Sequence, residues 1–292
     1  MINRNISKIG LGTGRLSSLG ESISQKQCNE LIKTALENGI TVLDTADTYG
    51  SGDAERMLGK SITGMRENFF VITKAGFPHV SLPGWLSPVN QIGKKVMQKL
   101  NYKQNFSKIY LLKALHKSLK RLNVEAVDAF VLHEPLILEL TDDSWAALEK
   151  ISTSGMARYT GVSTSDHKVV LSGIESKQIQ IVETPVSLLK KNENEIVRLC
   201  NESQIPIVAN QVLAGYHHFK RNNEIKLKAI QEKYNIDDDL VKFFIGYVVG
   251  QPGIISTLIG TKNNQHLIIN SKIINNTEKL FDLYTEIQSL NI

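Results

Sequence analysis

The sequence predicts a single-domain α/β protein, a (β/α)8 TIM barrel that spans residues 1–292. Eight short apolar runs of strand length alternate with helical patterns, which indicates parallel strands joined by crossover helices. The length of 292 residues is ordinary for one such barrel. The expected strands are residues 8–13, 40–46, 69–74, 127–133, 157–163, 179–184, 205–210 and 254–260.

Two of the segments between these runs carry clear helix signals. Residues 24–38 begin with a serine, have Gln27 three residues later and end before Gly39. Residues 107–122 place four leucines on one face and three lysines with Arg121 on the other, which predicts an amphipathic helix with an exposed basic face. The connection at about 75–106 is long and contains its own helix signal, Ser87-Pro88.

Composition favours a globular protein with a large core, because hydrophobic residues make up 41% of the chain and charged residues 22%. No apolar run approaches the roughly 18 residues that span a bilayer, and the N-terminus lacks a signal-peptide core. Cys28 and Cys200 fall in helical patterns, so we expect reduced thiols. These observations predict a cytoplasmic protein without membrane insertion.

Reactive side chains follow three consecutive predicted strands. Asp44, Lys74 and His133 stand at the ends of the second, third and fourth runs, and Tyr49 lies in the loop after the second. Because neighbouring strands lie about 4.8 Å apart, side chains at adjacent strand ends touch. The four residues therefore predict a proton-transfer site at one end of the barrel.

Tyr49 is the natural proton donor of this group. A free tyrosine has a pKa of about 10, and a nearby ammonium lowers it. Lowering the pKa by two units takes about 2.7 kcal/mol, which one poorly solvated lysine supplies. We expect Lys74 to lower the pKa of Tyr49, Asp44 to keep Lys74 charged, and His133 to orient a carbonyl oxygen.

Several segments resemble signatures of the aldo-keto reductase family, in the expected order over nearly the whole chain. The resemblance implies a catalytic tetrad of Asp44, Tyr49, Lys74 and His133. It also implies reversible reduction of a small aldehyde or ketone to the alcohol by NADPH. The segments are residues 44–50 (DTADTYG), 54–59 (AERMLG), 127–133 (VDAFVLH), 155–163 (GMARYTGVS) and 255–262 (ISTLIGTK), with Asn270 further on.

The same resemblance assigns residues to the nicotinamide end of the cofactor. Ser163 matches the family, Thr164 stands where Asn is usual, and Glu183 stands where Gln is usual. An ionised Glu183 accepts a hydrogen bond but donates none, so either it is protonated or the carboxamide contact differs. Asn210 replaces an aromatic residue that often stacks on nicotinamide. It opens a loop that resembles the pyrophosphate loop, with Gln211, Leu213 and Gly215.

The end of the eighth predicted strand is expected to bind the rest of the cofactor. Gly260, Thr261 and Lys262 open the last barrel helix, whose free amides and lysine suit the 2′-phosphate of NADP. Asn270 matches the adenine-side asparagine of the family. We therefore expect NADPH to be preferred over NADH. The glycines at 10–14 (GLGTG) fail the G-x-G-x-x-G spacing and do not indicate a Rossmann site.

The substrate side is predicted to be basic. Residues 68–124 contain nine lysines and Arg121 but no acidic residue. We expect Trp85 and the long connection to cover part of the pocket and the lysines to favour an anionic substrate or the cofactor phosphates. A solvated lid helix without specific contacts is an equal alternative. No aromatic stacking pattern accompanies the charge, which excludes a nucleic-acid role; no metal site is expected.

Two other functions use the same residues. Lys74 at a barrel strand end suits the Schiff base of an aldolase. A cofactor-binding regulatory or sensor subunit with little turnover would keep the same site. The sequence leaves open the physiological substrate, the direction of the reaction and the oligomeric state.

Overall fold

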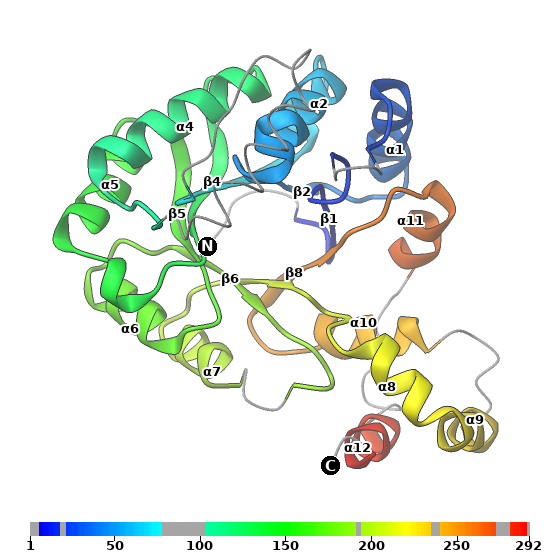
Figure 1. Cartoon of the computed structure of the whole chain (residues 1–292). Coiled ribbons are helices and arrows are strands. Elements are labelled where there is room, and N and C mark those ends of the chain that lie inside the picture. The colour runs from blue at the N-terminus through cyan, green and yellow to red at the C-terminus, as the bar shows by residue number, and fades with distance from the viewer. Residues whose placement is uncertain are drawn as a thin grey trace.

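The computed structural model describes residues 6–17, 22–77, 103–190, 194–234, 240–272 and 281–290. Its eight strands are all parallel and pair in chain order, and β8 pairs with β1, so the barrel is closed (Figure 1). This confirms the predicted (β/α)8 barrel, with every strand bound within two residues of its expected place. The strands are β1 Ile9–Gly12, β2 Val42–Asp44, β3 Phe70–Ala75, β4 Val127–His133, β5 Ala157–Ser163, β6 Ile181–Pro185, β7 Ile207–Asn210 and β8 Ile254–Ile259.

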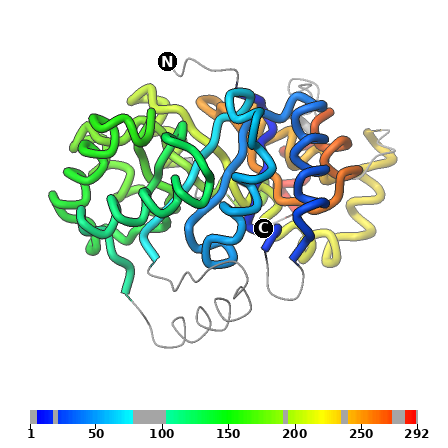
Figure 2. The backbone as a smooth tube through the Cα atoms, turned by 90° about the horizontal axis from the view of Figure 1, so that it is seen from above, coloured from blue at the N-terminus to red at the C-terminus, as the bar shows by residue number. Residues whose placement is uncertain are grey.

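Helices surround the barrel, and three more lie outside this ring near the C-terminus. Figure 2 shows the green helices α5 and α6 and the yellow helices α8 and α9 at opposite ends of the molecule. The ring comprises α1 Gln25–Glu37, α2 Asp53–Ile62, α4 Lys108–Leu122, α5 Asp142–Thr153, α6 His167–Glu175, α7 Asn194–Glu202, α10 Val241–Val249 and α11 Asn264–Ser271. The outer helices are α8 Tyr216–Asn222, α9 Glu224–Lys233 and α12 Phe281–Ser289, which share a core with α10.

The two helices with clear sequence signals form as expected. Ser24 caps α1: its side chain accepts from the backbone of Gln27, and the Gln27 side chain accepts from the backbone of Ser24. Gly39 follows in the left-handed region, with φ of +74°. Helix α4 buries Leu111, Leu115 and further residues of the predicted apolar face.

Alternation along the strands places the functional layer of the barrel. An apolar cluster inside the barrel is formed by Val42, Phe70, Ile72, Ala129, Val131, Ile181, Val208 and Leu258. Residues two positions apart on a strand point to the same side. Two residues after the last cluster member on each strand stand Asp44, Lys74, His133, Glu183, Asn210 and Gly260. A polar layer therefore lies directly on an apolar one, at the C-terminal ends of the strands.

The long connection after β3 falls mostly outside the described residues. Trp85, the helix signal at Ser87-Pro88 and three lysines of this segment lie there, so the expectations about them stay predictions. None of the helices in the described ranges is long and apolar enough to cross a membrane.

Gly161 is where the barrel has least room for a side chain. A Cβ at this position of β5 would stand 1.8 Å from the carbonyl oxygen of Ile181 on β6. We expect Gly161→Ala to lower the free energy of unfolding by about 3 kcal/mol, because the two strands must separate. Urea denaturation followed by circular dichroism measures this change.

Gly12→Ala in β1 is the matched control. The nearest atom to its Cβ would be 4.0 Å away, so the change is expected to stay below about 1 kcal/mol. Equal losses in the two variants would contradict close strand packing as the cause.

Candidate active site

Three buried charges meet at the C-terminal end of the barrel. The Lys74 ammonium donates to Asp44 Oδ1 and, over 2.9 Å, to Glu183 Oε2. The three residues are only 1%, 3% and 2% exposed, respectively. We call Asp44, Lys74 and Glu183 the Lys74 cluster. Asp44 reaches Lys74 from the neighbouring strand β2, whereas Glu183 reaches it from β6, across the barrel interior.

The sequence placed Glu183 beside the cofactor carboxamide and did not predict its ion pair with Lys74. Both of its carboxylate oxygens have partners, because Asn210 Nδ2 donates to Oε1 over 2.7 Å. The position of Glu183 in its strand could have indicated this contact. Glu183 stands two residues after the inward-facing Ile181, as Lys74 stands two residues after Ile72, so both side chains point into the barrel.

Burial and crowding of like charges change the protonation of the Lys74 cluster. Burial and the nearby Glu183 carboxylate raise the pKa of Asp44 to about 8, although Lys74 opposes them. Burial lowers the pKa of Lys74, but the two carboxylates outweigh it and the net pKa is raised. The ammonium is therefore charged at neutral pH, and Asp44 largely keeps its proton there.

Tyr49 and His133 complete the predicted group of four. The Lys74 Nζ lies 5.6 Å from the centre of the Tyr49 ring. The Tyr49 and His133 rings meet edge to face, with centroids 5.9 Å apart and an interplanar angle of 85°. Phe77 packs against His133 in the same manner at 5.2 Å. The structure thus brings together all four residues that the sequence singled out.

The expected direction of the Tyr49 pKa is wrong. Burial raises the pKa of this phenol, and the Asp44, Glu183 and Glu134 carboxylates raise it further, against the effect of Lys74. The expectation from the sequence considered only Asp44 beside Lys74 and did not include the burial of the phenol. Desolvation of the buried phenol is the largest effect, and together with the carboxylates it outweighs the ammonium.

The segment that carries Tyr49 has an unusual backbone. Gly50, Ser51 and Gly52 all have left-handed φ values, of +56°, +56° and +92°. The conformation costs about 1–2 kcal/mol at Ser51, which has a Cβ. A Cβ on Gly50 would meet Ser17 at 2.3 Å, and one on Gly52 would meet Arg121 at 2.6 Å. The segment is held between the β1–α1 connection and α4.

A buried ion pair between Glu55 and Arg121 lies next to the segment at Gly50–Gly52. Glu55 of α2 accepts from Arg121 Nε of α4 and from Thr73 Oγ1 of β3, both over 2.6 Å. Sequence analysis placed Arg121 on the exposed basic face, which is wrong: its side chain is only 8% exposed. Since Thr73 precedes Lys74, the network ties α2 and α4 to the strand that carries the buried lysine.

The residues expected at the nicotinamide end lie on the rim beside the Lys74 cluster. Ser163 ends β5 and Thr164 follows it; both are buried, and the Thr164 amide donates to the Glu183 carbonyl over 2.9 Å. Asn210 ends β7, and its Oδ1 is buried with no hydrogen-bond partner among the described residues. Its amide orientation is set by Glu183, to which Nδ2 donates. A buried acceptor of this kind fits the amide group of a nicotinamide.

The loops after β7 and β8 hold the other expected cofactor residues. Gln211 and Gly215 have left-handed φ values, and Leu213 packs at the edge of the core between them. After β8 come Gly260, Thr261 and Lys262, and Asn270 is buried in α11.

The sequence predicts free amides at the start of α11, but these amides have hydrogen-bond partners. The helix begins at Asn264, and Asn263 Oδ1 accepts from the amides of Gln265 and His266 at 2.8 and 3.2 Å. Thr261 Oγ1 in turn accepts from the Asn263 amide over 3.1 Å. An anion at this end would depend on Lys262 and the preceding loop more than on the helix amides.

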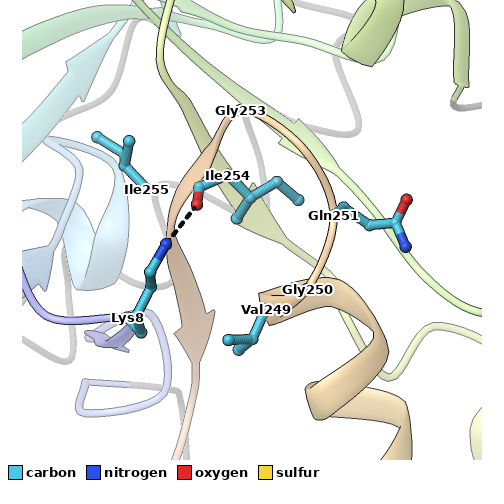
Figure 3. Close-up of a pocket in the computed structure, with 7 residues that line it drawn as sticks. All are labelled: Lys8, Val249, Gly250, Gln251, Gly253, Ile254 and Ile255. Carbon is cyan, nitrogen blue, oxygen red and sulfur yellow. Dashed lines mark hydrogen bonds between the residues drawn. The ribbon is translucent and has the colours of Figure 1, made fainter. Parts of the chain in front are cut away.

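Two cavities lie at the other end of the barrel. One, of about 470 Å³, is at the starts of β1 and β8, where Lys8 donates to the Ile254 carbonyl (Figure 3). The second, of about 430 Å³, lies between the ends of α2 and α4 and the start of β4. Neither belongs to the candidate site. Among the described residues no group of three or more His, Cys, Asp or Glu is arranged to hold a metal ion.

Comparison with known proteins agrees with this geometry. A sequence model described as the Aldo/keto reductase family matches residues 8–291. The chain belongs to this family. It is 25% identical to the uncharacterized oxidoreductase YqkF of Bacillus subtilis over 291 residues, which are 93% of this chain and 88% of that protein. It is also 25% identical to the methylglyoxal reductase YeaE of Escherichia coli, over 85% of this chain and 78% of that protein.

Solved structures of family members share the fold. The holo form of the aldo-keto reductase AKR11C1 from Bacillus halodurans superposes with a TM-score of 0.77 at 21% identity, over 98% of this chain and 92% of that chain. An aldo/keto reductase from Klebsiella pneumoniae in complex with NADP and acetate has a TM-score of 0.73 at 21% identity, over 96% and 92%.

Arg121 gives a direct test of the support beneath Tyr49. We expect Arg121→Met to lower the free energy of unfolding by about 3–5 kcal/mol, because Glu55 is left buried without its cation. Chemical denaturation measures the loss. The double variant Arg121→Met/Glu55→Gln removes the stranded charge and should recover at least half of it. A double variant as unstable as Arg121→Met would show that the ion pair is not responsible.

Proposed function

We propose that this aldo/keto reductase family member is an NADPH-dependent oxidoreductase that reduces an aldehyde or ketone to its alcohol, reversibly. The observation that carries the proposal is that the Tyr49 ring lies close to both the buried ammonium of Lys74 and the ring of His133. A proton donor, a cation and a second hydrogen-bonding group converge there on one small volume of the barrel mouth.

Proton delivery is the task of Tyr49 in this proposal. Its raised pKa keeps the phenol protonated at neutral pH, so the acid is present when a carbonyl arrives. The alkoxide formed by reduction is a stronger base than a phenolate and takes the proton. Lys74 then stabilises the negative phenolate, and His133 orients the carbonyl oxygen toward the phenol.

The cofactor would supply a hydride to the carbonyl carbon. Support for NADP comes from the Klebsiella relatives, whose structures contain NADP or NADPH. We assign the carboxamide end to Ser163, Thr164 and the buried acceptor Asn210 Oδ1, with Glu183 behind it. The pyrophosphate is assigned to Gln211, Leu213 and Gly215, and the 2′-phosphate and adenine to Gly260, Thr261, Lys262 and Asn270.

The aldolase alternative is less well supported. A Schiff-base lysine needs a neutral amine at neutral pH, whereas the pKa of Lys74 is raised by two carboxylates. A regulatory or sensor role is separated from catalysis by turnover. The methylglyoxal reductase among the relatives makes small aldehydes the first substrates to try. A preference for anionic substrates stays a prediction from the charge of residues 68–124.

Substitution of the proton donor tests the proposed reaction. We expect Tyr49→Phe to lower kcat for carbonyl reduction by about 10²–10⁴-fold, the usual contribution of a general acid. Loss of NADPH absorbance with a panel of carbonyl compounds measures the rate. NADPH binding, followed by quenching of protein fluorescence, should be unchanged. Wild-type protein that binds NADPH but turns over none of the panel would favour the sensor alternative, and full turnover by Tyr49→Phe would exclude this proton donor.

Lys262 tests the preference for NADPH. We expect Lys262→Met to weaken NADPH binding about tenfold or more, because one charged hydrogen bond to the 2′-phosphate is worth about 1.5–3 kcal/mol. NADH, which lacks that phosphate, should bind both proteins equally. Titration calorimetry with both cofactors measures the difference. Parallel weakening for the two cofactors would place the phosphate elsewhere.

A further inference from the structure

We infer that Glu183 is a positioning residue: as a second counter-ion of Lys74 it fixes the orientation of the ammonium and keeps Tyr49 in its acid form. This would bias the site toward reduction. The role in reduction rests on the proposed function, but the electrostatic part concerns the protein alone.

The contacts around Lys74 carry the first step. A lysine ammonium has three N–H donors. Asp44 on β2 takes one and Glu183 on β6 takes another. Two acceptors on opposite sides of the barrel prevent rotation of the ammonium about its Cε–Nζ bond. Among the described residues, its third N–H is then the one left to face the Tyr49 ring, 5.6 Å away.

The charge of the Lys74 cluster carries the second step. With both carboxylates ionised it has one positive and two negative charges, all nearly inaccessible to water. Below the pH at which Asp44 loses its proton, the cluster is neutral. Above it, the cluster has a net negative charge, which opposes formation of a phenolate at Tyr49. With glutamine in place of Glu183, the cluster would stay neutral at high pH.

In the part of the chain that the structure describes, few other charges face these groups. Tyr49 and Asp47 come from the connection after β2, and His133 and Glu134 come from the end of β4. Strands β1, β7 and β8 contain no titratable residue, and those of β5, Arg158 and Tyr159, lie near its opposite end. Glu134 also raises the pKa of Tyr49, but it is exposed to solvent, whereas Glu183 is buried and bonded to Lys74. It provides the matched control.

Asn210 shows that Glu183 is held in place for this contact. Its amide donates to Glu183 Oε1 over 2.7 Å, while Lys74 donates to Oε2 over 2.9 Å, so both carboxylate oxygens are held. The pKa of Asp44, raised to about 8, agrees with this arrangement.

The test is a pH titration of the cofactor-free protein. Tyrosinate absorbance is measured for wild type and for Glu183→Gln. From each curve, the curve of the same protein carrying Tyr49→Phe is subtracted, and the difference reports Tyr49 alone. We expect Tyr49 in Glu183→Gln to ionise at a pH at least about one unit lower, because one buried negative charge is removed. Glu134→Gln should shift the ionisation of Tyr49 by less than Glu183→Gln, because water weakens the field of the exposed Glu134 charge. Wild-type behaviour of Glu183→Gln would overturn the inference.

The pH dependence of unfolding provides a second readout that needs no tyrosinate. The folded pKa of Asp44, about 8, lies above its ordinary value of 3.8. Its contribution to stability is therefore fully present below about pH 4 and is lost as the pH rises through about 8. Glu183→Gln should lose less stability than wild type between pH 6 and pH 9. An unchanged slope would count against the effect of Glu183 on the pKa of Asp44.

Glu183→Asp and the rate measurements separate the possible failures. Glu183→Asp keeps the negative charge, so its unfolding free energy should change with pH as in wild type. This variant still tests the role of the charge if Glu183→Gln does not fold. If reduction is measurable, its rate in Glu183→Gln should fall at a lower pH than in wild type. Absence of turnover in wild type would contradict the proposed function. The titration of Tyr49 would still test the role of Glu183, because it does not depend on turnover.

Discussion

The buried ammonium of Lys74 is the constraint on which the candidate site depends. An isolated lysine at 1% exposure would lose its charge or destabilise the fold. Here two carboxylates compensate it, one from the adjacent strand and one from the far side of the barrel. Only a closed barrel brings β2, β3 and β6 together in this way. The fold and the charge of the site therefore require each other.

The apolar layer beneath the site explains why these charges remain strong. Val42, Ile72 and Ile181 fill the interior below Asp44, Lys74 and Glu183 and exclude water from that side. Electrostatic interactions weaken less in such surroundings than at a surface. Above the layer, the left-handed segment at Gly50–Gly52 sets where Tyr49 stands, and the Glu55–Arg121 ion pair supports it. Packing of Ser17 on one side of this segment and of Arg121 on the other offsets the conformational strain of its left-handed backbone.

The site departs from the pattern that the family resemblance implies at Thr164, Glu183 and Asn210, and the last two residues adjoin. Glu183 occupies the position of a glutamine, and Asn210 that of an aromatic residue. In the structure these two departures contact each other, since Asn210 donates to the carboxylate that also binds Lys74. Together they place a carboxylate at the centre of the site and an amide that donates to it.

The sequence alone determined the eight-stranded barrel, because strand periodicity, helix caps such as Ser24 and strand-terminal side chains are local signals. The same signals were enough to group Asp44, Tyr49, Lys74 and His133. Tertiary structure decided the ion pair between Lys74 and Glu183, which lie 109 positions apart. It also decided the burial of Arg121 on a face that the helix pattern marked as solvated. The direction of the Tyr49 pKa followed from these contacts, because desolvation and the number of nearby charges depend on how strands distant in the chain pack together.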